Sequence, residues 1–400
     1  MTVKRILAVA LNTFVLLATS TELPTIPSLQ THQSRSSGPA YSFTNRTTIY
    51  APVNNQTVGY PRITELSDGS LLVACTLSGN YPGYFPIFKS GDGGVTWSWL
   101  SNVGAGGDPV GLGAQPSLLQ LSQAFGDFPA GTILAAGNRM DMDSTNIDLY
   151  ASKDVGKTWQ FVSTIAQGGP PSTGDGGSSI WEPFLMEYKN TVVAYYSDSR
   201  DDNYSQKLSH QTSTNLIDWA NPVNDVTYPN YIDRPGMSVV AYIPPLSKYM
   251  LVYEHGNGTR SSGGNNYPDS YKLAADPLLF DKASAIPIEA KDMNGTVVQN
   301  LEPGSAPYVV WSPVGGVNGT IVVTDANHRK LFINRRGGAE DGWETRDVAQ
   351  PRAYARALHV LSGHTDHLVI VGAGPFRPKP GEKTPLSVSV VNLTALVEGS

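Results

Sequence analysis

The chain has 400 residues, only 16% of which are charged, together with 40 glycines and 29 prolines. This composition favours many short strands joined by turns over long helices. The formal net charge is −6, and no run of Lys and Arg is longer than two residues. Because phosphate backbones are bound by concentrated Lys and Arg, the composition argues against a nucleic acid partner and favours an uncharged or weakly charged ligand.

The first twenty residues have the features of a secretory signal peptide. Lys4 and Arg5 precede a largely apolar run over residues 6–18, and small residues at 18–20 offer a cleavage site. The apolar run is too short to span a bilayer, so we expect a secreted, extracellular protein with no membrane anchor. Residues 21–39 are polar and rich in Pro and Ser, and we expect them to form a flexible lead.

Two further features concern export and stability. Seven Asn-x-Ser/Thr sequons favour glycosylation in the secretory pathway, at Asn45, Asn55, Asn203, Asn257, Asn294, Asn318 and Asn392. Cys75 is the sole cysteine, so no intramolecular disulfide can form, and its apolar surroundings predict a buried thiol. Stability must therefore come from packing and from closure of the fold.

Six segments share one plan, in which a polar or aromatic start, usually with Pro, precedes two apolar strands separated by a turn. They begin at Tyr60-Pro61-Arg62, Gln115-Pro116-Ser117, Trp181-Glu182-Pro183, Asp233-Arg234-Pro235, Ala306-Pro307-Tyr308 and Tyr354-Ala355-Arg356. They recur every roughly 50–70 residues, slightly more than in compact propeller blades. We therefore predict an all-β fold, a single six-bladed β-propeller of four-stranded antiparallel sheets over residues 40–400.

The repeats also contain apolar runs that suit strands buried on both faces. These runs cover residues 70–74, 132–136, 191–195, 249–253, 320–324 and 368–372. Residues 47–50 are expected to pair with residues 387–391, which would close the ring and remove exposed sheet edges. A closed ring has no need of a partner, so we expect a monomer.

A second repeat falls between these strands. The segments 90–97 and 152–159 share the form Ser-x-Asp-x-Gly-x-Thr-Trp, and 213–219 is a degenerate copy. This is the Asp-box, a hairpin turn in which the Asp side chain caps backbone N–H groups and the Trp packs between strands. It is a structural motif and does not by itself indicate a reaction.

Propellers bind ligands over the central channel, where the innermost strand of each blade begins. At equivalent points the six units supply Arg62, Gln115, Glu182, Arg234, Tyr308 and Tyr354, and Asn138 belongs to a second ring at the ends of the following strands. We expect these polar groups to converge on one axis. Arg62, Asn138, Trp181, Arg234, Tyr308 and Tyr354 are the candidate substrate-binding residues.

Two carboxylates stand out as candidate catalytic residues. Glu182 lies between Trp181 and Pro183, and Glu254 follows an apolar strand that ends at Tyr253. Glycoside hydrolysis usually requires two carboxyl groups on opposite sides of one bond. Apolar neighbours can raise the pKa of one carboxyl group so that it stays protonated and acts as the acid. The structural alternative is that either Glu caps a loop or pairs with an Arg.

We expect neither a metal nor a cofactor. The chain has no His-Glu-x-x-His segment and no cysteine cluster. His359, His364 and His367 lie around a turn in the sixth unit and are expected to be surface residues. No Gly-x-Ser-x-Gly segment marks a serine nucleophile.

The segments Tyr60-Pro61-Arg62-Ile63, Ile180-Trp181-Glu182-Pro183-Phe184 and Tyr253-Glu254-His255-Gly256, with the Asp-boxes, resemble glycoside hydrolase family 93, the fungal exo-arabinanases. The resemblance runs from about Thr44 to the C-terminus. It implies a retaining enzyme that releases arabinobiose from the non-reducing end of linear α-1,5-L-arabinan. It also implies Glu182 and Glu254 as nucleophile and acid/base, with Glu182 favoured as the nucleophile.

Retention predicts carboxyl groups about 5–5.5 Å apart. The resemblance places Arg62, Trp181, Arg234 and Tyr354 along the furanose subsites. A sialidase or another exo-glycosidase is the alternative, because Arg62 and Arg234 could bind a sugar carboxylate and Tyr354 could act as its nucleophile. A second alternative is a non-catalytic sugar-binding propeller, which would need no pair of Glu residues.

Overall fold

The computed structural model describes residues 42–53, 56–78, 83–104, 111–257, 267–291, 301–374 and 384–399. All the described residues belong to one compact unit, Pro39–Ser400. The predicted signal peptide and lead (1–39) and the sequons at Asn55 and Asn294 lie outside the described residues. No helix in the described ranges is long and apolar enough to cross a membrane.

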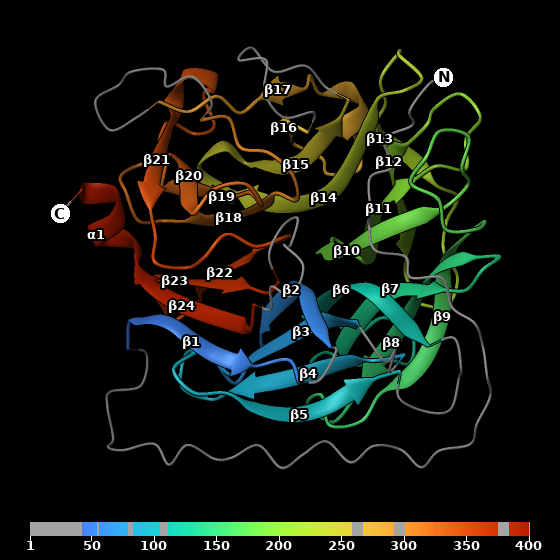
Figure 1. Ribbon diagram of the computed structural model, residues 1–400, viewed down its shortest axis with the longest axis horizontal. Coiled ribbons are helices and arrows are strands. Elements are labelled where there is room, and N and C mark those ends of the chain that lie inside the picture. Colours follow the sequence, from blue (N-terminus) through green and yellow to red (C-terminus); the bar gives the residue numbers. More distant parts are fainter. Residues whose placement is uncertain are drawn as a thin grey trace. The chain divides into compact units, whose positions relative to one another are not determined.

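The described strands form six four-stranded antiparallel sheets, which are the blades of a ring (Figure 1). Blade 1 contains β2 (Thr57–Glu65), β3 (Leu71–Ser78), β4 (Phe85–Ser90) and β5 (Ser98–Val103). Blade 2 contains β6 (Leu112–Gln120), β7 (Ile133–Met140), β8 (Thr145–Ser152) and β9 (Gln160–Gly168). Blade 3 contains β10 (Ile180–Tyr188), β11 (Thr191–Asp198), β12 (Lys207–Ser213) and β13 (Val223–Val226).

The other three blades follow the same order from the axis outward. Blade 4 contains β14 (Arg234–Ile243), β15 (Lys248–Gly256), β16 (Asp269–Ala274) and β17 (Ile286–Pro287). Blade 5 contains β18 (Tyr308–Ser312), β19 (Thr320–Thr324), β20 (Lys330–Asn334) and β21 (Trp343–Asp347). Blade 6 contains β22 (Ala357–Leu361), β23 (His364–Gly372), β24 (Leu386–Asn392) and β1 (Thr44–Tyr50). The predicted six-bladed all-β propeller is confirmed.

The first described strand closes the ring. β1 supplies the outer strand of the last blade by pairing antiparallel with β24, with Thr47 opposite Val388. At the axis each innermost strand packs against the next one, and β22 packs against β2. The predicted pairing of residues 47–50 with the last strand is therefore confirmed. Closure satisfies the backbone groups that an open sheet edge would expose.

The predicted apolar runs form the second strand of each blade and are buried on both faces. Residues Leu71 to Cys75 of β3 are fully buried, and so are Leu368 to Val371 of β23. Each strand is covered by neighbouring blades on its two sides, which explains why its residues do not alternate between apolar and polar. The Cys75 thiol is free and buried as predicted, and burial raises its pKa to about 12.

The Asp-box turns form the predicted hydrogen bonds. Asp154 accepts hydrogen bonds from the Thr158 main-chain N–H (2.9 Å) and the Thr158 hydroxyl (2.7 Å). The indole N–H of Trp159 then donates to Ser101 Oγ of the preceding blade (3.0 Å). Trp219, in the degenerate copy, donates in the same way to Ser163 of the blade before it (3.1 Å). These turns therefore join adjacent blades.

One residue at the start of each innermost strand has a left-handed backbone conformation. These six residues are Tyr60 (φ 48°), Gln115 (62°), Glu182 (66°), Met237 (60°), Ala306 (53°) and Ala355 (56°), and in blade 5 the preceding Ser305 (68°) shares the conformation. In blades 1 to 4 the pairing of the first two strands slips at this residue, which is the mark of a β-bulge. Such a conformation costs a non-glycine residue about 1–2 kcal/mol. The left-handed residue changes the direction of the backbone at the start of the strand. The residues around it form the candidate site.

Candidate active site

Glu182 is the left-handed residue of β10, and its backbone and side chain are both held by neighbours. Its N–H donates to Gln115 Oε1 (3.1 Å) and to Asn138 Oδ1 (3.2 Å) of blade 2. Its Oε2 accepts hydrogen bonds from the Ser197 hydroxyl (2.7 Å) and from the Met237 main-chain N–H (2.9 Å). These donors fix one carboxylate oxygen and favour the ionised form.

Glu254 lies near the end of β15 and is held in a similar way. Its Oε2 accepts a hydrogen bond from the Ala306 main-chain N–H (2.8 Å). Ala306 is the left-handed residue of blade 5, just as Met237 is that of blade 4. Each candidate carboxylate therefore accepts a hydrogen bond from the left-handed residue of the next blade, which directs that N–H toward the axis.

The two carboxylates meet above Gly236 of β14. A methyl group built on Gly236 would lie 3.5 Å from Glu182 Oε2 and 3.6 Å from Glu254 Oε1. Because both oxygens are this close to one point, they are separated by no more than the sum of those two distances. Carboxyl groups on opposite sides of a glycosidic bond are about 5–5.5 Å apart in retaining enzymes and about 6.5–9.5 Å in inverting enzymes. The pair thus fits glycoside hydrolysis.

The surroundings of the two carboxyl groups shift their pKa values to different extents. Burial and the charge of the nearby Glu182 together raise the pKa of Glu254 to about 8, against the opposing hydrogen bonds of Ala306 and Ser305. Burial also raises the pKa of Glu182, but the hydrogen bonds from Ser197 and Met237 and the charges of two arginines act in the opposite direction. Glu254 is therefore the better proton donor and Glu182 the better nucleophile.

Arg62 and Tyr308 lie in the wall of the channel. Arg62 is buried, and its Nη1 donates to the carbonyl oxygens of Pro61 (2.8 Å) and Ala355 (3.2 Å). Its guanidinium lies over the rings of Tyr60 (4.1 Å) and Tyr308 (5.2 Å). Tyr308 is also buried. The Arg62 guanidinium is thus buried among these groups, and its charge acts to lower the pKa of Glu182. Substrate binding by Arg62 and Tyr308 stays a prediction.

Arg234 is half-buried at the start of β14 and donates hydrogen bonds to the loop before β12. Its Nη1 donates to Ser205 Oγ (2.8 Å) and its Nη2 to Gln206 Oε1 (2.7 Å). Gln206 Nε2 in turn donates to the Pro235 carbonyl oxygen (2.9 Å). The same Nε2 would lie 3.0 Å from a methyl group on Gly236. Gln206 thus borders the space between the two carboxylates.

Trp181 and Tyr354 each precede a left-handed residue and are half-buried. The indole Nε1 of Trp181 is buried without a hydrogen-bond partner among the described residues. The Tyr354 hydroxyl donates to Met237 Sδ (3.2 Å). Burial raises the pKa of Tyr354 well above its usual value, and the charges of Glu254 and Glu182 add to this effect. Tyr354 therefore lies near both carboxylates, and its role in substrate binding stays a prediction.

Asn138, a predicted substrate-binding residue, contacts β10 in this structure, and its binding of substrate stays a prediction. Asn138 is fully buried, its Nδ2 donates to the Ile180 carbonyl oxygen (2.8 Å), and its Oδ1 accepts from the Glu182 N–H (3.2 Å). Both ends of the amide are used to position β10. Sequence reasoning also missed Ser197, Gln206 and Gly236. Gln115 was noted only as one of the six starts, although it holds the backbone of Glu182.

The six predicted starts are not equivalent positions. Gln115 and Glu182 are left-handed residues, whereas Arg62 and Tyr308 follow such a residue by two positions. Arg234 precedes Met237, the left-handed residue of its blade, by three positions. The prolines do not mark the left-handed residue consistently. Pro183 directly follows the left-handed Glu182 in blade 3, whereas Pro235 precedes the left-handed Met237 by two positions in blade 4.

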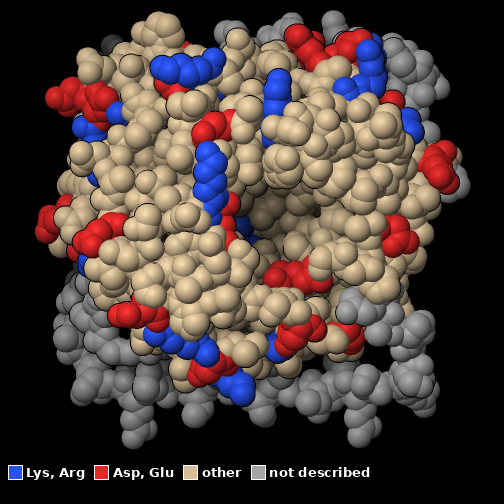
Figure 2. All heavy atoms as spheres, turned by 180° about the vertical axis from the view of Figure 1, so that it is seen from behind, with Lys and Arg blue, Asp and Glu red and all other residues tan. Residues whose placement is uncertain are grey.

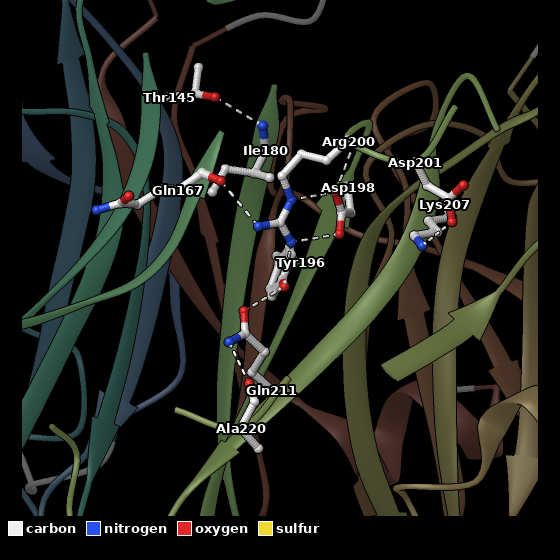
Figure 3. A network of polar contacts seen from close by, with 10 residues as sticks. All are labelled: Thr145, Gln167, Ile180, Tyr196, Asp198, Arg200, Asp201, Lys207, Gln211 and Ala220. Carbon is white, nitrogen blue, oxygen red and sulfur yellow. Dashed lines mark hydrogen bonds and ion pairs between the residues drawn. The ribbon is translucent and has the colours of Figure 1, made fainter. Parts of the chain in front are cut away.

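The loop that carries Ser205 and Gln206 is anchored by a polar network around Arg200 (Figure 3). The Arg200 guanidinium donates to both oxygens of Asp198 (2.8 and 2.7 Å), to the Tyr196 hydroxyl (2.9 Å) and to the Gln167 carbonyl oxygen (3.1 Å). Burial acts to lower the pKa of Arg200, but the hydrogen bonds that Arg200 donates to Asp198 and Tyr196 outweigh it and raise the pKa. This network joins blades 2 and 3 beside the site.

The molecule has a hollow on the face drawn in Figure 2, with acidic and basic side chains beside it. A separate cavity of about 290 Å³ lies in blade 4 and includes Tyr228, His255 and Glu302 in its lining. His255 stacks on Tyr228, with ring centroids 3.8 Å apart. This cavity adjoins Glu254 through the next residue in the chain.

The predicted positions of the three histidines need one correction. His359 contacts Glu65 (2.8 Å) and is half-buried, whereas His367 is buried and stacks on Phe43. His364, Asp366 and His367 have possible ligand atoms within 4.8 Å of one another. They lie at the start of β23, away from the strands that carry Glu182 and Glu254. The expectation that no metal is bound stays a prediction.

Comparisons with known proteins show which solved structures this chain is similar to. No family model matches the chain, and no curated protein matches it. The structure is similar to the α-L-arabinofuranosidase Arb93A of Fusarium graminearum, solved with an iminosugar inhibitor (TM-score 0.83, 41% identity, 88% of this chain and 99% of that chain). The same organism's GH93 α-L-arabinofuranosidase solved with arabinobiose gives a TM-score of 0.83 and 40% identity, over 88% of this chain and 99% of that chain.

A second fungal protein and a sialidase complete the comparison. The α-L-arabinanase of Penicillium chrysogenum, solved with arabinobiose, gives a TM-score of 0.81 and 38% identity over 89% of this chain and 100% of that one. The sialidase Hz136 shares only the fold, at 13% identity and a TM-score of 0.55, over 85% of this chain and 66% of that one. On the strength of the Fusarium and Penicillium enzymes, the chain belongs to glycoside hydrolase family 93.

Proposed function

We propose that the protein is a retaining exo-arabinanase that removes arabinobiose from the non-reducing end of linear α-1,5-L-arabinan. The observation that carries the proposal is the meeting of Glu182 and Glu254 above Gly236, with different hydrogen bonds on the two carboxylates. Family membership supports the substrate class, because two of the similar proteins were solved with arabinobiose.

The chemistry follows from the two environments. Glu254 donates its proton to the oxygen of the scissile linkage while Glu182 Oε1 or Oε2 attacks the anomeric carbon, so the C–O bond breaks and a glycosyl ester forms on Glu182. Water then attacks the same carbon, Glu254 accepts a proton from it, and the Glu182 carboxylate leaves. Two inversions at one carbon give net retention of configuration.

The sialidase alternative has less support. A sialidase would need free arginines to bind the carboxylate of its sugar. Arg62 donates to two carbonyl oxygens, and Arg234 donates to Ser205 and Gln206. The sugar-binding alternative does not account for two carboxylates placed together in a desolvated site, which costs stability and would serve no purpose in a lectin.

The first test is product analysis. The protein should be incubated with linear arabinan, branched arabinan and sialyl-lactose, and the products separated by chromatography. Arabinobiose as the sole early product from linear arabinan supports the proposal. Arabinose as the first product would instead indicate a monomer-releasing arabinofuranosidase, and release of sialic acid would contradict the proposal altogether. Proton NMR of the first product distinguishes retention from inversion.

The second test assigns the two carboxylates. Glu182→Gln and Glu254→Gln should each lower turnover by a factor of about 10³ or more, since each removes a group that acts directly on the reacting bond. Azide should rescue a Glu182→Ala variant and give a glycosyl azide of inverted configuration, which would identify the nucleophile. Substantial activity in either Gln variant would exclude that residue from catalysis.

We further propose that the protein is secreted as a glycoprotein and acts as a monomer. The N-terminal apolar run, the sequons and the closed ring support this. Expression in a fungal host, followed by N-terminal sequencing of protein from the medium, tests the predicted cleavage near residue 20. Protein that is retained in cells with Met1 at its N-terminus would contradict secretion, and light scattering of the purified protein tests the monomer.

A further inference from the structure

The residue just before the left-handed residue differs in side-chain size from blade to blade. The six residues at this position are Gly59, Ala114, Trp181, Gly236, Ser305 and Tyr354. Neither Gly59 nor Gly236 has a positive φ. The backbone at these two positions therefore does not require glycine, and another reason must be sought for the missing side chain at Gly236.

The surroundings of the two glycines are different. A methyl group on Gly59 would have no heavy atom within 4 Å, so the position is open. A methyl group on Gly236 would lie 3.0 Å from Gln206 Nε2, 3.5 Å from Glu182 Oε2 and 3.6 Å from Glu254 Oε1. The two carboxylate distances are ordinary van der Waals contacts, whereas the Gln206 amide would have to move by a few tenths of an ångström. A methyl group here would occupy the space between the two carboxylates.

Gln206 faces the same space from the neighbouring blade. Its side chain is buried, its Oε1 accepts from Arg234, and its Nε2 donates to the Pro235 carbonyl oxygen. These two hydrogen bonds fix the plane of the amide and its orientation. A primary amide nitrogen carries two hydrogens, so Nε2 has a further hydrogen with which to bind a neutral acceptor beside the two carboxylates.

We propose that Gly236 is the floor of the subsite in which the glycosidic bond is cleaved, and that the Gln206 amide donates a hydrogen bond to a hydroxyl of the sugar ring seated there. This inference rests on the proposed function. Gly236 acts by leaving room for the ring between the two carboxylates. Gln206 acts as a substrate-binding residue, and Arg234 acts through Gln206 as a positioning residue. The ligand is a neutral sugar with a free ring hydroxyl.

The test compares two Gly-to-Ala substitutions at equivalent positions of two blades. Gly236→Ala and Gly59→Ala add the same methyl group to the innermost strand, in blade 4 and blade 1. We expect Gly236→Ala to lower kcat/KM on linear arabinan oligosaccharides by about 100-fold, because displacement of a bound substrate by about 1 Å has an effect of that size. Gly59→Ala should stay within about threefold of wild type. Both variants should melt close to the wild-type temperature.

A second pair of variants tests Gln206. Gln206→Ala should raise the Kd for arabinobiose, measured by calorimetry, and should lower kcat/KM by about tenfold or more. Gln123→Ala is the matched control, because Gln123 is half-buried and its amide donates only to the Lys189 carbonyl oxygen among the described residues. If Gly236→Ala fails to fold, the Gln206 pair still decides the role of this space.

The outcomes distinguish failure of the proposed function from failure of the roles assigned to Gly236 and Gln206. If wild type does not cleave arabinan, the proposed function and this inference both fail. An active wild type with an equally active Gly236→Ala variant overturns the role of Gly236 alone. Unchanged arabinobiose affinity in Gln206→Ala likewise overturns the role of Gln206, while the arabinanase function stands.

Discussion

The main-chain N–H of Met237 donates to Oε2 of Glu182 at 2.9 Å and so joins the innermost strands of blades 4 and 3. Ser197 Oγ donates to the same oxygen at 2.7 Å and accepts from the same N–H at 3.2 Å. This triangle fixes one oxygen of Glu182. Burial raises the pKa of Glu182. Because hydrogen bonds to the charged form lower a carboxyl pKa, the triangle acts against this rise and favours the ionised form.

Removal of the Ser197 hydroxyl should weaken Glu182 as a nucleophile. Ser197→Ala deletes one of the two hydrogen bonds to Oε2, so we expect kcat to fall by about 10–100-fold and the pKa of Glu182 to rise. The acidic limb of the kcat/KM profile should therefore move to higher pH. If Ser197 had only a structural role, Ser197→Ala would lower kcat/KM equally at all pH values.

Ser209→Ala provides the matched control for this variant. Ser209 is a buried serine in the next strand of the same blade, and its hydroxyl has no hydrogen-bond partner among the described residues. We expect its activity and its pH profile to equal those of wild type. An equal loss in both variants would contradict the role assigned to Ser197.

The basic limb of the pH profile should report Glu254. Burial and the charge of Glu182 raise its pKa to about 8, and the acid must be protonated to donate to the linkage oxygen. The rate is therefore expected to fall tenfold per pH unit above about pH 8. Steady-state kcat/KM measured between pH 4 and pH 10 on linear arabinan checks this, and a rate that stays constant up to pH 10 would contradict the assignment of Glu254 as the acid.

The Asp-box turns should contribute stability without affecting the reaction. Burial acts to raise the pKa of Asp154, but the hydrogen bonds of Thr158 and Ser152 outweigh it and lower the pKa to about 2. Asp154→Ala removes these hydrogen bonds and should lower the free energy of unfolding by about 1–2 kcal/mol. Asp143→Ala, at an exposed carboxylate, is the control. Chemical denaturation checks the expectation, and kcat at 25 °C should be unchanged in both variants.

The fold could be predicted because its signals are local. Apolar runs such as residues 368–372 and the turns at Asp92 and Asp154 each specify their own structure from adjacent residues. A propeller repeats such units, so their spacing was sufficient to predict six blades. The pairing of residues 47–50 with the last strand followed from the same need to remove sheet edges.

The partners of the two glutamates could not be predicted in this way. Two of the donors are main-chain N–H groups, of Met237 and Ala306, and their direction depends on a left-handed φ that no residue type indicates there. Ser197 lies in an apolar strand and belongs to no motif. The alignment on Pro235 placed Arg234 at the wrong point of blade 4, because spacing does not reveal where a strand bulges. Asn138 shows that a polar residue near a strand end can be fully buried, which the sequence does not reveal.

Glu254 should also make the stability of the protein depend on pH. Its carboxyl group has a pKa of about 8 in the folded protein and about 4.3 in an unfolded chain. Between these values the unfolded chain releases a proton that the folded protein retains, so the stabilisation present at low pH is lost as the pH rises toward 8. Glu254→Gln cannot ionise, and it should therefore lose less stability than wild type between pH 5 and pH 9. Thermal melts at each pH should show the difference in Tm (variant minus wild type) growing with pH, while Glu398→Gln, at an exposed carboxylate, should show no such trend. A constant difference would mean that Glu254 is ionised at neutral pH, and the acid would then have to be sought elsewhere in the site.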